Sequence, residues 1–150
     1  MDKYVINGGR PLNGSLPALR SKNSTLPILA GALLADSGVS RILEVPGLRD
    51  INVMLQVLEH LGVKCNRESD SGLVELDATE LTGHEAPYDL VRQMRASFLV
   101  LGALVARLGE ARVSLPGGCS LGQRPVDLHL KGLLQLGVEI EEEGGYVIAR

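Results

Sequence analysis

The sequence predicts an α/β domain made of two copies of one unit, each a helix, a strand, a second helix and two further strands. Short segments that recur about 70 residues later reveal the copies. The recurring pairs are Gly31-Ala-Leu-Leu-Ala35 with Gly102-Ala-Leu-Val-Ala106, Pro46-Gly47 with Pro116-Gly117, and Leu61-Gly62-Val63 with Leu136-Gly137-Val138. Alternating helices and strands are typical of domains in which sheets bury helices.

Composition bounds the class of protein. The 150 residues suffice for one domain with a sizeable core, and 45% hydrophobic but only 3% aromatic residues predict that this core is aliphatic. The net charge of −3 argues against a nucleic-acid or anionic-membrane partner, which would need a basic surface. The start of the chain does not resemble a signal peptide, and the apolar runs are too short to span a bilayer. Two cysteines without a secreted pattern fit a reducing cytoplasm.

The first unit is predicted from helical and extended patterns over residues 22–78. We expect a helix over 26–35 with a cap among 21–25, a strand over 39–45, a helix over 51–61, and a hairpin of 63–65 with 73–76. Asp50 is the expected cap of the second helix, and Gly62 is expected to end it. Cys65 alternates with polar residues, which predicts a structural thiol.

The second unit is predicted over residues 86–150. We expect a long helix over 89–107, a strand over 111–115, a helix over 128–136 begun by 125–127, and a closing hairpin of 138–141 with 146–149. Arg92 and Arg95 lie three positions apart, on one face of the long helix. Because a helix dipole disfavours cations in the N-terminal half, at least one of them is expected to meet an anion, with a solvated arginine face as the alternative.

Two stretches carry polar groups suited to chemistry. Lys22 and Asn23 fall at the N-terminus of the first helix, where free N–H groups favour an anion, although a solvated lysine and a plain cap are the alternative. The second stretch, residues 115–129, places Cys119 among glycines and five residues before Arg124. Such a loop suits a mobile lid with an activated thiol over an anionic substrate. An ordinary Gly-Pro turn with an inert cysteine is the alternative, and His129 is interpreted as a surface or capping residue.

Together these motifs resemble the N-terminal third of the UDP-N-acetylglucosamine 1-carboxyvinyltransferases (the MurA family), which are enolpyruvyl transferases. The resemblance extends over essentially the whole chain. It rests on three segments: Lys22-Asn23 with Leu26-Pro27, Ala86-Pro-Tyr-Asp-Leu-Val-Arg-Gln-Met-Arg-Ala-Ser97, and Leu115-Pro-Gly-Gly-Cys-Ser-Leu-Gly-Gln-Arg-Pro-Val-Asp-Leu-His129. The third is the most specific, because related transferases that act on shikimate phosphate lack the cysteine loop.

The resemblance implies a fold, a reaction and a place in the cell. The fold is the enolpyruvyl transferase fold, an inside-out α/β barrel of repeated units, of which about two are present. The reaction moves the enolpyruvyl group of phosphoenolpyruvate to the 3′-hydroxyl of UDP-N-acetylglucosamine, releases phosphate, and uses no metal or cofactor. It opens peptidoglycan synthesis in the bacterial cytoplasm, and therefore serves cell wall growth, cell shape and division. The implied partners are these small-molecule substrates, with no nucleic acid or membrane.

The resemblance also assigns roles to residues. Lys22 and Asn23 match the pair that holds phosphoenolpyruvate, and Arg95 matches an arginine that contacts the nucleotide sugar. Cys119 matches the proton donor to the enolpyruvyl methylene, which can also form an adduct with phosphoenolpyruvate and is alkylated by the antibiotic fosfomycin. Arg124 lies near the substrate phosphate and begins the segment that binds UDP-N-acetylglucosamine, which comprises Arg124, Pro125, Val126, Asp127 and Leu128.

The match has one departure and a limited extent. Leu19-Arg20-Ser21 precedes Lys22 where the family usually has Ser-Gly-Ala, which puts that turn and the phosphoenolpyruvate site in doubt. We expect residues 1–21 to be a strand segment that packs with a second domain, and residues 22–150 to be a partial first domain. The base that accepts the sugar proton is expected beyond Arg150. A non-catalytic module that binds a UDP-sugar, or self-associates through uncovered apolar surface, is the alternative.

Overall fold

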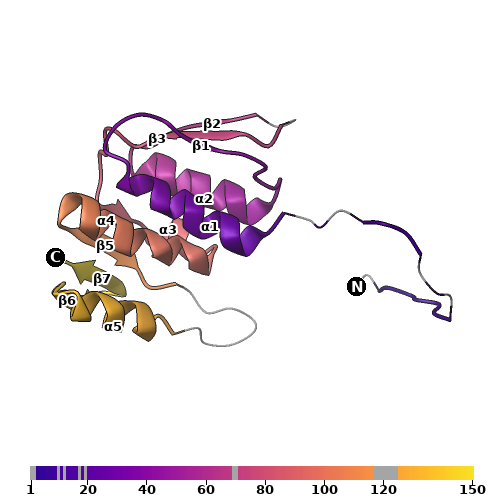
Figure 1. Ribbon diagram of the computed structural model, residues 1–150. Helices are drawn as coiled ribbons and strands as arrows, with labels where there is room; N and C mark the ends of the chain where they lie inside the picture. Colours follow the sequence, from indigo (N-terminus) through magenta and orange to yellow (C-terminus); the bar gives the residue numbers. More distant parts are fainter. Residues whose placement is uncertain are drawn as a thin grey trace.

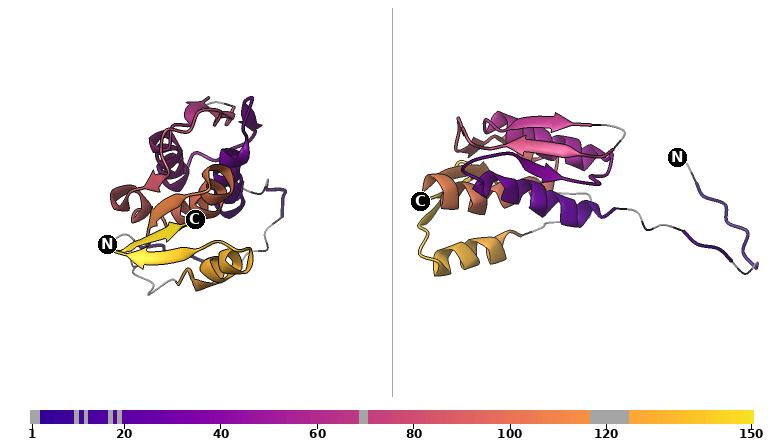
Figure 2. Two further views of the ribbon diagram at one scale, coloured as in Figure 1. Left: turned by 90° about the vertical axis from the view of Figure 1, so that its left-hand side faces the viewer. Right: turned by 45° about the horizontal axis from the view of Figure 1, so that its top comes forward.

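Two sheets lie on opposite sides of a layer of helices in the computed structural model of the chain (Figures 1 and 2). The structure describes residues 3–9, 11, 13–16, 18, 20–68, 71–116 and 125–150. Helices α1, α2 and α4 pack together between the sheets, which places the helices inside and the strands outside. Within the described residues the two sheets remain separate and do not close into a barrel, as expected for about two repeat units.

The first unit has the predicted order of elements. It contains α1 (Lys22–Gly31), the 3-10 helix η1 (Ala32–Leu34), β1 (Ser40–Ile42), α2 (Arg49–His60), β2 (Lys64–Arg67) and β3 (Val74–Asp77). The three strands form an antiparallel sheet in the order β1-β3-β2. Helix α1 begins before the predicted residue 26, because the Ser21 hydroxyl accepts a hydrogen bond from the Ser24 N–H at 3.3 Å and caps the helix there.

The second unit repeats this topology. It contains β4 (Glu85–Ala86), α3 (Tyr88–Val91), the 3-10 helix η2 (Arg95–Leu99), α4 (Val100–Leu108), β5 (Ala111–Ser114), α5 (Asp127–Gln135), β6 (Ile140–Glu143) and β7 (Tyr146–Ala149). Its sheet has the order β4-β5-β7-β6, in which β5-β7-β6 reproduces the antiparallel order β1-β3-β2 of the first unit. The internal repeat is therefore confirmed at the level of strand pairing.

Two local predictions were wrong. The expected helix over 89–107 is broken, because Met94 has an extended backbone (φ −154°, ψ 120°) that separates α3 from η2. Arg92 and Arg95 therefore do not share a face of one helix. Asp50 is not the cap of α2, since Leu48 occupies that position and Asp50 lies in the first turn.

The core is aliphatic, as the composition predicts. Large side chains from α1, α2 and α4 are completely buried where the helices meet, namely Leu29, Met54, Leu58 and Leu104. The N-terminal segment, by contrast, contains no strand among its described residues, and Tyr4 and Ile6 are almost fully exposed. A strand forms only when it pairs with a neighbouring strand. The predicted packing of residues 1–21 with a second domain is not tested by this structure and stays a prediction. No helix in the described parts of the chain has both the length and the apolar character to cross a membrane.

Candidate functional site

A cavity of about 710 Å³ lies where the two repeat units meet. Its wall combines the first turns of α1 and α2 with the α3–η2 connection and the start of α5. Elements from both units therefore contribute to one hollow. The polar and charged side chains that line it include Lys22, Asn23, Asp50, Arg92, Arg95 and His129.

Lys22 and Asn23 are the first two residues of α1, as the capping pattern predicted. The Lys22 Nζ donates a hydrogen bond to the Asp50 Oδ2 at 2.6 Å, which links the beginnings of α1 and α2. Both side chains remain partly exposed to solvent in the cavity, Lys22 at 42% and Asp50 at 33%. The ammonium has three donor protons, so two remain for another acceptor.

The two arginines reach the cavity from either side of the break in the chain. Arg92 follows α3 as its C-terminal cap, stacks over the Tyr88 ring at 5.4 Å and pairs with Asp89 at 3.5 Å. A cation at the C-terminal end of a helix is favourable, so the dipole argument for an anion partner does not apply to Arg92. Arg95 begins η2, and its guanidinium donates to the Pro125 carbonyl oxygen at 2.6 Å.

The predicted nucleotide segment is only partly gathered at the cavity. Val126 is buried and lines the wall, while Pro125 contributes its carbonyl oxygen to Arg95. Asp127 lies in the exposed first turn of α5, and Leu128 is 77% exposed; neither lines the cavity. Cys119 and Arg124 lie outside the described residues. The structure thus brings Lys22, Asn23, Arg95 and Val126 to one cavity.

Sequence reasoning missed Asp50 and His129 as cavity residues. Asp50 was interpreted as a helix cap, and only the fold brings it to Lys22, 28 positions earlier in the chain. His129 lies beside the Phe98 ring, with centroids 6.2 Å apart in an edge-to-face arrangement. The repeat held a signal for His129, because it occupies the position of Met54, which is fully buried in the first unit. A histidine at a position where the other unit has a buried methionine indicates that the side chain is not part of the core in the second unit.

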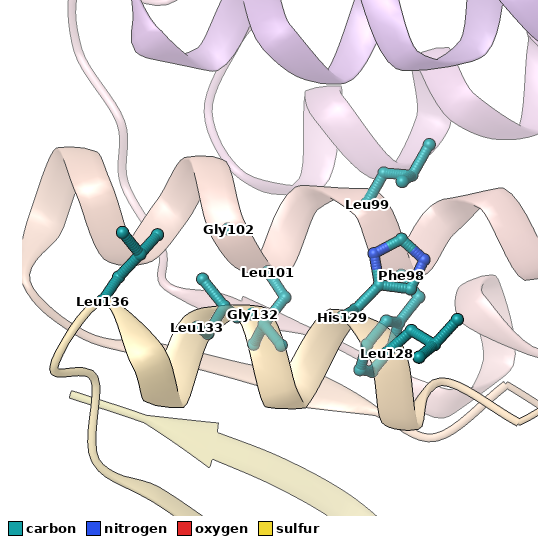
Figure 3. A pocket seen from close by; sticks show the side chains of 9 residues that line it. All are labelled: Phe98, Leu99, Leu101, Gly102, Leu128, His129, Gly132, Leu133 and Leu136. Atoms are coloured by element: carbon teal, nitrogen blue, oxygen red, sulfur yellow. The ribbon is translucent and has the colours of Figure 1, made fainter.

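An apolar groove lies between α4 and α5, next to the cavity (Figure 3). It has a volume of about 340 Å³, and Leu101, Leu133 and Leu136 are among the side chains that line it. Helix α5 has no buried residue, and Leu136 is 82% exposed although its counterpart Leu61 in the first unit is fully buried. The second unit therefore leaves apolar surface uncovered that the first unit buries.

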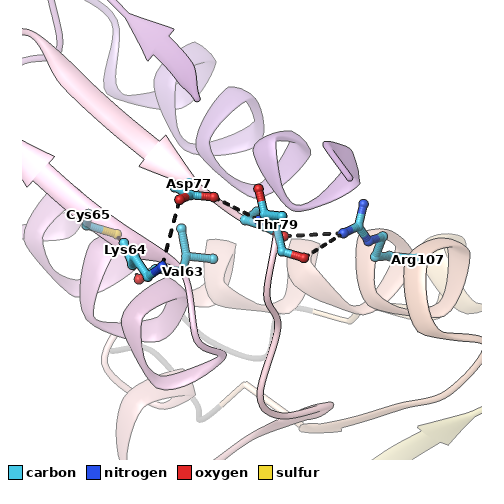
Figure 4. Close-up of polar contacts among 7 residues, drawn as sticks. Val63, Lys64, Cys65, Asp77, Thr79 and Arg107 are labelled. Carbon is cyan, nitrogen blue, oxygen red and sulfur yellow. Dashed lines mark hydrogen bonds and ion pairs between the residues drawn. The ribbon is translucent and has the colours of Figure 1, made fainter. Parts of the chain in front are cut away.

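Cys65 lies away from the cavity, on β2 (Figure 4). Burial, with a smaller contribution from the carboxylate of Glu59, raises the pKa of this thiol to about 12. It therefore stays protonated at neutral pH, which agrees with the prediction of a structural thiol. Close by, Asp77 accepts a hydrogen bond from the Thr79 N–H at 3.0 Å, and Arg107 of α4 donates to the carbonyl oxygen of Thr79 at 3.3 Å.

The charges around the cavity suit an anion. Lys22, Arg92 and Arg95 are cations, and Asp50 is the only acidic side chain among the described residues of the wall. Lysine and arginine side chains are donors that suit phosphate or carboxylate oxygens. Among the described residues, no three His, Cys, Asp or Glu side chains gather in a group that could hold a metal ion.

The comparisons with known proteins agree with one another. The family model of EPSP synthase (3-phosphoshikimate 1-carboxyvinyltransferase) matches residues 6–150. The chain is 52% identical over 149 residues to a UDP-N-acetylglucosamine 1-carboxyvinyltransferase of Desulfosudis oleivorans. This match covers 99% of this chain and 35% of that protein. The chain is 55% identical over 152 residues to the protein of the same name from Myxococcus xanthus, with 99% and 36% covered. The chain spans about a third of the length of these relatives.

A solved structure supports the same fold. The crystal structure of the enolpyruvyl transferase NikO from Streptomyces tendae superposes with a TM-score of 0.73 at 26% sequence identity. The match covers 95% of this chain and 31% of that one. The predicted fold class, repeated α/β units of the enolpyruvyl transferase type, is therefore confirmed.

Proposed function

Because this chain belongs to the EPSP synthase family of enolpyruvyl transferases, we propose that it acts in the transfer of an enolpyruvyl group from phosphoenolpyruvate to the 3′-hydroxyl of UDP-N-acetylglucosamine. Curated relatives that are more than half identical to it carry the name of that enzyme. The proposed reaction releases phosphate and uses no metal or cofactor. Its place is the bacterial cytoplasm, in the first committed step of peptidoglycan synthesis.

One observation carries the proposal. Four residues that the family resemblance assigns to substrates lie on three separate elements of the chain, and all four line one cavity: Lys22, Asn23, Arg95 and Val126. Three cations around that cavity suit the phosphate and carboxylate groups of phosphoenolpyruvate and the diphosphate of the sugar nucleotide.

The proposed chemistry is addition followed by elimination. The sugar oxygen bonds to C2 of phosphoenolpyruvate while Cys119 gives a proton to C3, and the hydroxyl proton passes to a base outside the proposed set of residues. The C–O bond to phosphate then breaks as C3 loses a proton, which restores the double bond and releases phosphate. Lys22 and Arg124 hold the phosphate oxygens and stabilise the charge that grows as phosphate leaves. Arg95 and residues 124–128 hold the nucleotide.

Phosphate release from phosphoenolpyruvate plus UDP-N-acetylglucosamine tests the activity directly. Release that requires both substrates and is abolished in Cys119→Ala would show that the chain completes the site, for example by self-assembly, although the base is expected beyond Arg150. Release that persists in Cys119→Ala would contradict the role of the thiol. If the chain binds UDP-N-acetylglucosamine in calorimetry but releases no phosphate, the non-catalytic binding module becomes the better description of this chain.

Fosfomycin labelling gives a second test with an internal control. We expect mass spectrometry to find the antibiotic on Cys119, with faster labelling when UDP-N-acetylglucosamine is present. Cys65 is the matched control, because burial keeps its thiol protonated. Equal labelling of the two cysteines would show that Cys119 is not activated.

Self-association is a second candidate function, favoured by the apolar groove between α4 and α5. Leu128 and Leu136 are largely exposed there, and a second copy of the chain would cover such a surface. Sedimentation velocity at increasing protein concentration tests this. We expect a dimer that Leu136→Lys shifts to monomer, and a monomer at all concentrations would exclude it.

A further inference from the structure

Asp50 is an anomaly in the cavity. A carboxylate in the wall of an anion site repels the ligand, yet this one lies beside the lysine assigned to phosphoenolpyruvate. Its role is therefore not to attract the ligand. The contact that explains its position is the bond from the Lys22 ammonium at 2.6 Å.

The carboxylate is the better fixed partner of this pair. Asp50 has a short side chain in the first turn of α2, where the helix dipole favours a negative charge. Lys22 has a long flexible stem and depends on a partner to stay in one place. The α2 terminus thus favours the negative charge of Asp50, and Asp50 in turn holds the ammonium of Lys22.

We propose that Asp50 sets the anion affinity of the Lys22 site by acting as its built-in counter-ion. In the free cavity the carboxylate neutralises the ammonium, and an incoming phosphate group has to share Lys22 with Asp50. This inference rests on the proposed function, since it concerns the same phosphate-binding lysine. The other residues assigned to this site increase its affinity for anions, whereas Asp50 would limit that affinity.

The expected consequence is weaker binding of both substrate and product. Interactions that hold ground states tightly do not speed the chemical step, and a tightly held phosphate product would leave slowly. A unit charge at about 4 Å in water changes an affinity by about fivefold. We therefore expect Asp50→Asn, which keeps the shape and removes the charge, to tighten the binding of phosphoenolpyruvate and of inorganic phosphate by about that factor.

Calorimetric titration of the chain with each anion at constant ionic strength tests the proposal. Asp50→Glu keeps the charge and should bind within about twofold of the unchanged chain, while Lys22→Gln should bind more weakly. Glu75→Gln is the matched control, because Glu75 also belongs to an ion pair, with Arg41 at 2.8 Å, but lies on β3 away from the cavity. It removes the same net charge from the chain.

The outcomes separate this inference from the proposed function. The inference is supported if Asp50→Asn binds the anions more tightly and Glu75→Gln does not. The same holds if Asp50→Asn is the only protein that binds measurably. If the unchanged chain binds phosphoenolpyruvate in a Lys22-dependent way but Asp50→Asn has the same or lower affinity, the inference is overturned and the proposed function stands. Equal tightening in Glu75→Gln would reduce the effect to net charge and would also overturn it. If neither the chain nor Asp50→Asn binds either anion, the phosphate site itself fails and the inference falls with it.

Discussion

Gly62 and Gly137 occupy the same position in the two repeat units, and replacing each by alanine should have very different effects. Both follow the second helix of their unit and have a positive φ, 102° for Gly62 and 90° for Gly137. An alanine is strained in either place, by about 1–2 kcal/mol. The surroundings differ, because a Cβ on Gly137 meets nothing within 4 Å, whereas a Cβ on Gly62 lies 2.6 Å from the Thr82 nitrogen and 2.7 Å from its Oγ1.

The contact at Gly62 adds two further terms. Overpacking of this kind typically destabilises by about 1–3 kcal/mol. The Thr82 N–H also donates to the Leu61 carbonyl oxygen at 3.0 Å, and displacing Thr82 would weaken that bond, worth about 1 kcal/mol. We therefore expect Gly62→Ala to lower the free energy of unfolding by about 3–6 kcal/mol and Gly137→Ala by about 1–2 kcal/mol.

Urea unfolding followed by circular dichroism measures both changes. Adding Thr82→Gly to Gly62→Ala should recover only part of the loss, because it removes the hydroxyl at 2.7 Å but leaves the Thr82 backbone nitrogen at 2.6 Å. Equal losses of stability in the two alanine variants would refute the reasoning, since the close contacts with Thr82 and with the Glu80 carbonyl oxygen distinguish the sites.

Three further outcomes follow from the contacts described above. Cys65, with its pKa raised to about 12, should react slowly with iodoacetamide at pH 8 in the folded chain and rapidly in urea. The Cys65 thiol ionises at a lower pH in the unfolded chain than in the folded chain. Its contribution to the stability of the folded chain is therefore present below about pH 9 and declines as the pH rises toward 12. Cys65→Ala should flatten that decline in urea titrations at alkaline pH. Hydrogen bonds from Thr79 lower the pKa of Asp77, so the contribution of this carboxylate to stability is present above the ordinary carboxyl pKa and declines as the pH falls below it. The loss of stability in Asp77→Asn should therefore be full at pH 7 and shrink steadily in acid. Arg95→Ala removes the bond to the Pro125 carbonyl and should weaken UDP-N-acetylglucosamine binding at least about tenfold in calorimetry, while Arg95→Lys should restore little of it because lysine lacks the planar fork.

The sequence alone determined the repeat, the aliphatic core and the presence of a cap just before the first helix, although the predicted helix began four residues late. Each of these depends on neighbours in the chain: the spacing of leucines fixes which helix face is apolar, a serine before Lys22 caps the helix, and glycine permits the positive φ at Gly62 and Gly137. The resemblance of the motifs then led to Lys22, Asn23 and Arg95, which the fold brings to one cavity.

Only the tertiary structure decided how those residues meet. The helical pattern continues through Met94, but η2 packs against α1 and α2, and an extended residue is needed to turn the chain into that position. The pairing of Lys22 with Asp50, and the place of His129 at the cavity, likewise depend on how two units stack. Local sequence patterns report the conformation of a few adjacent residues, whereas the charge balance of a cavity depends on residues that are distant in the chain and adjacent only after packing.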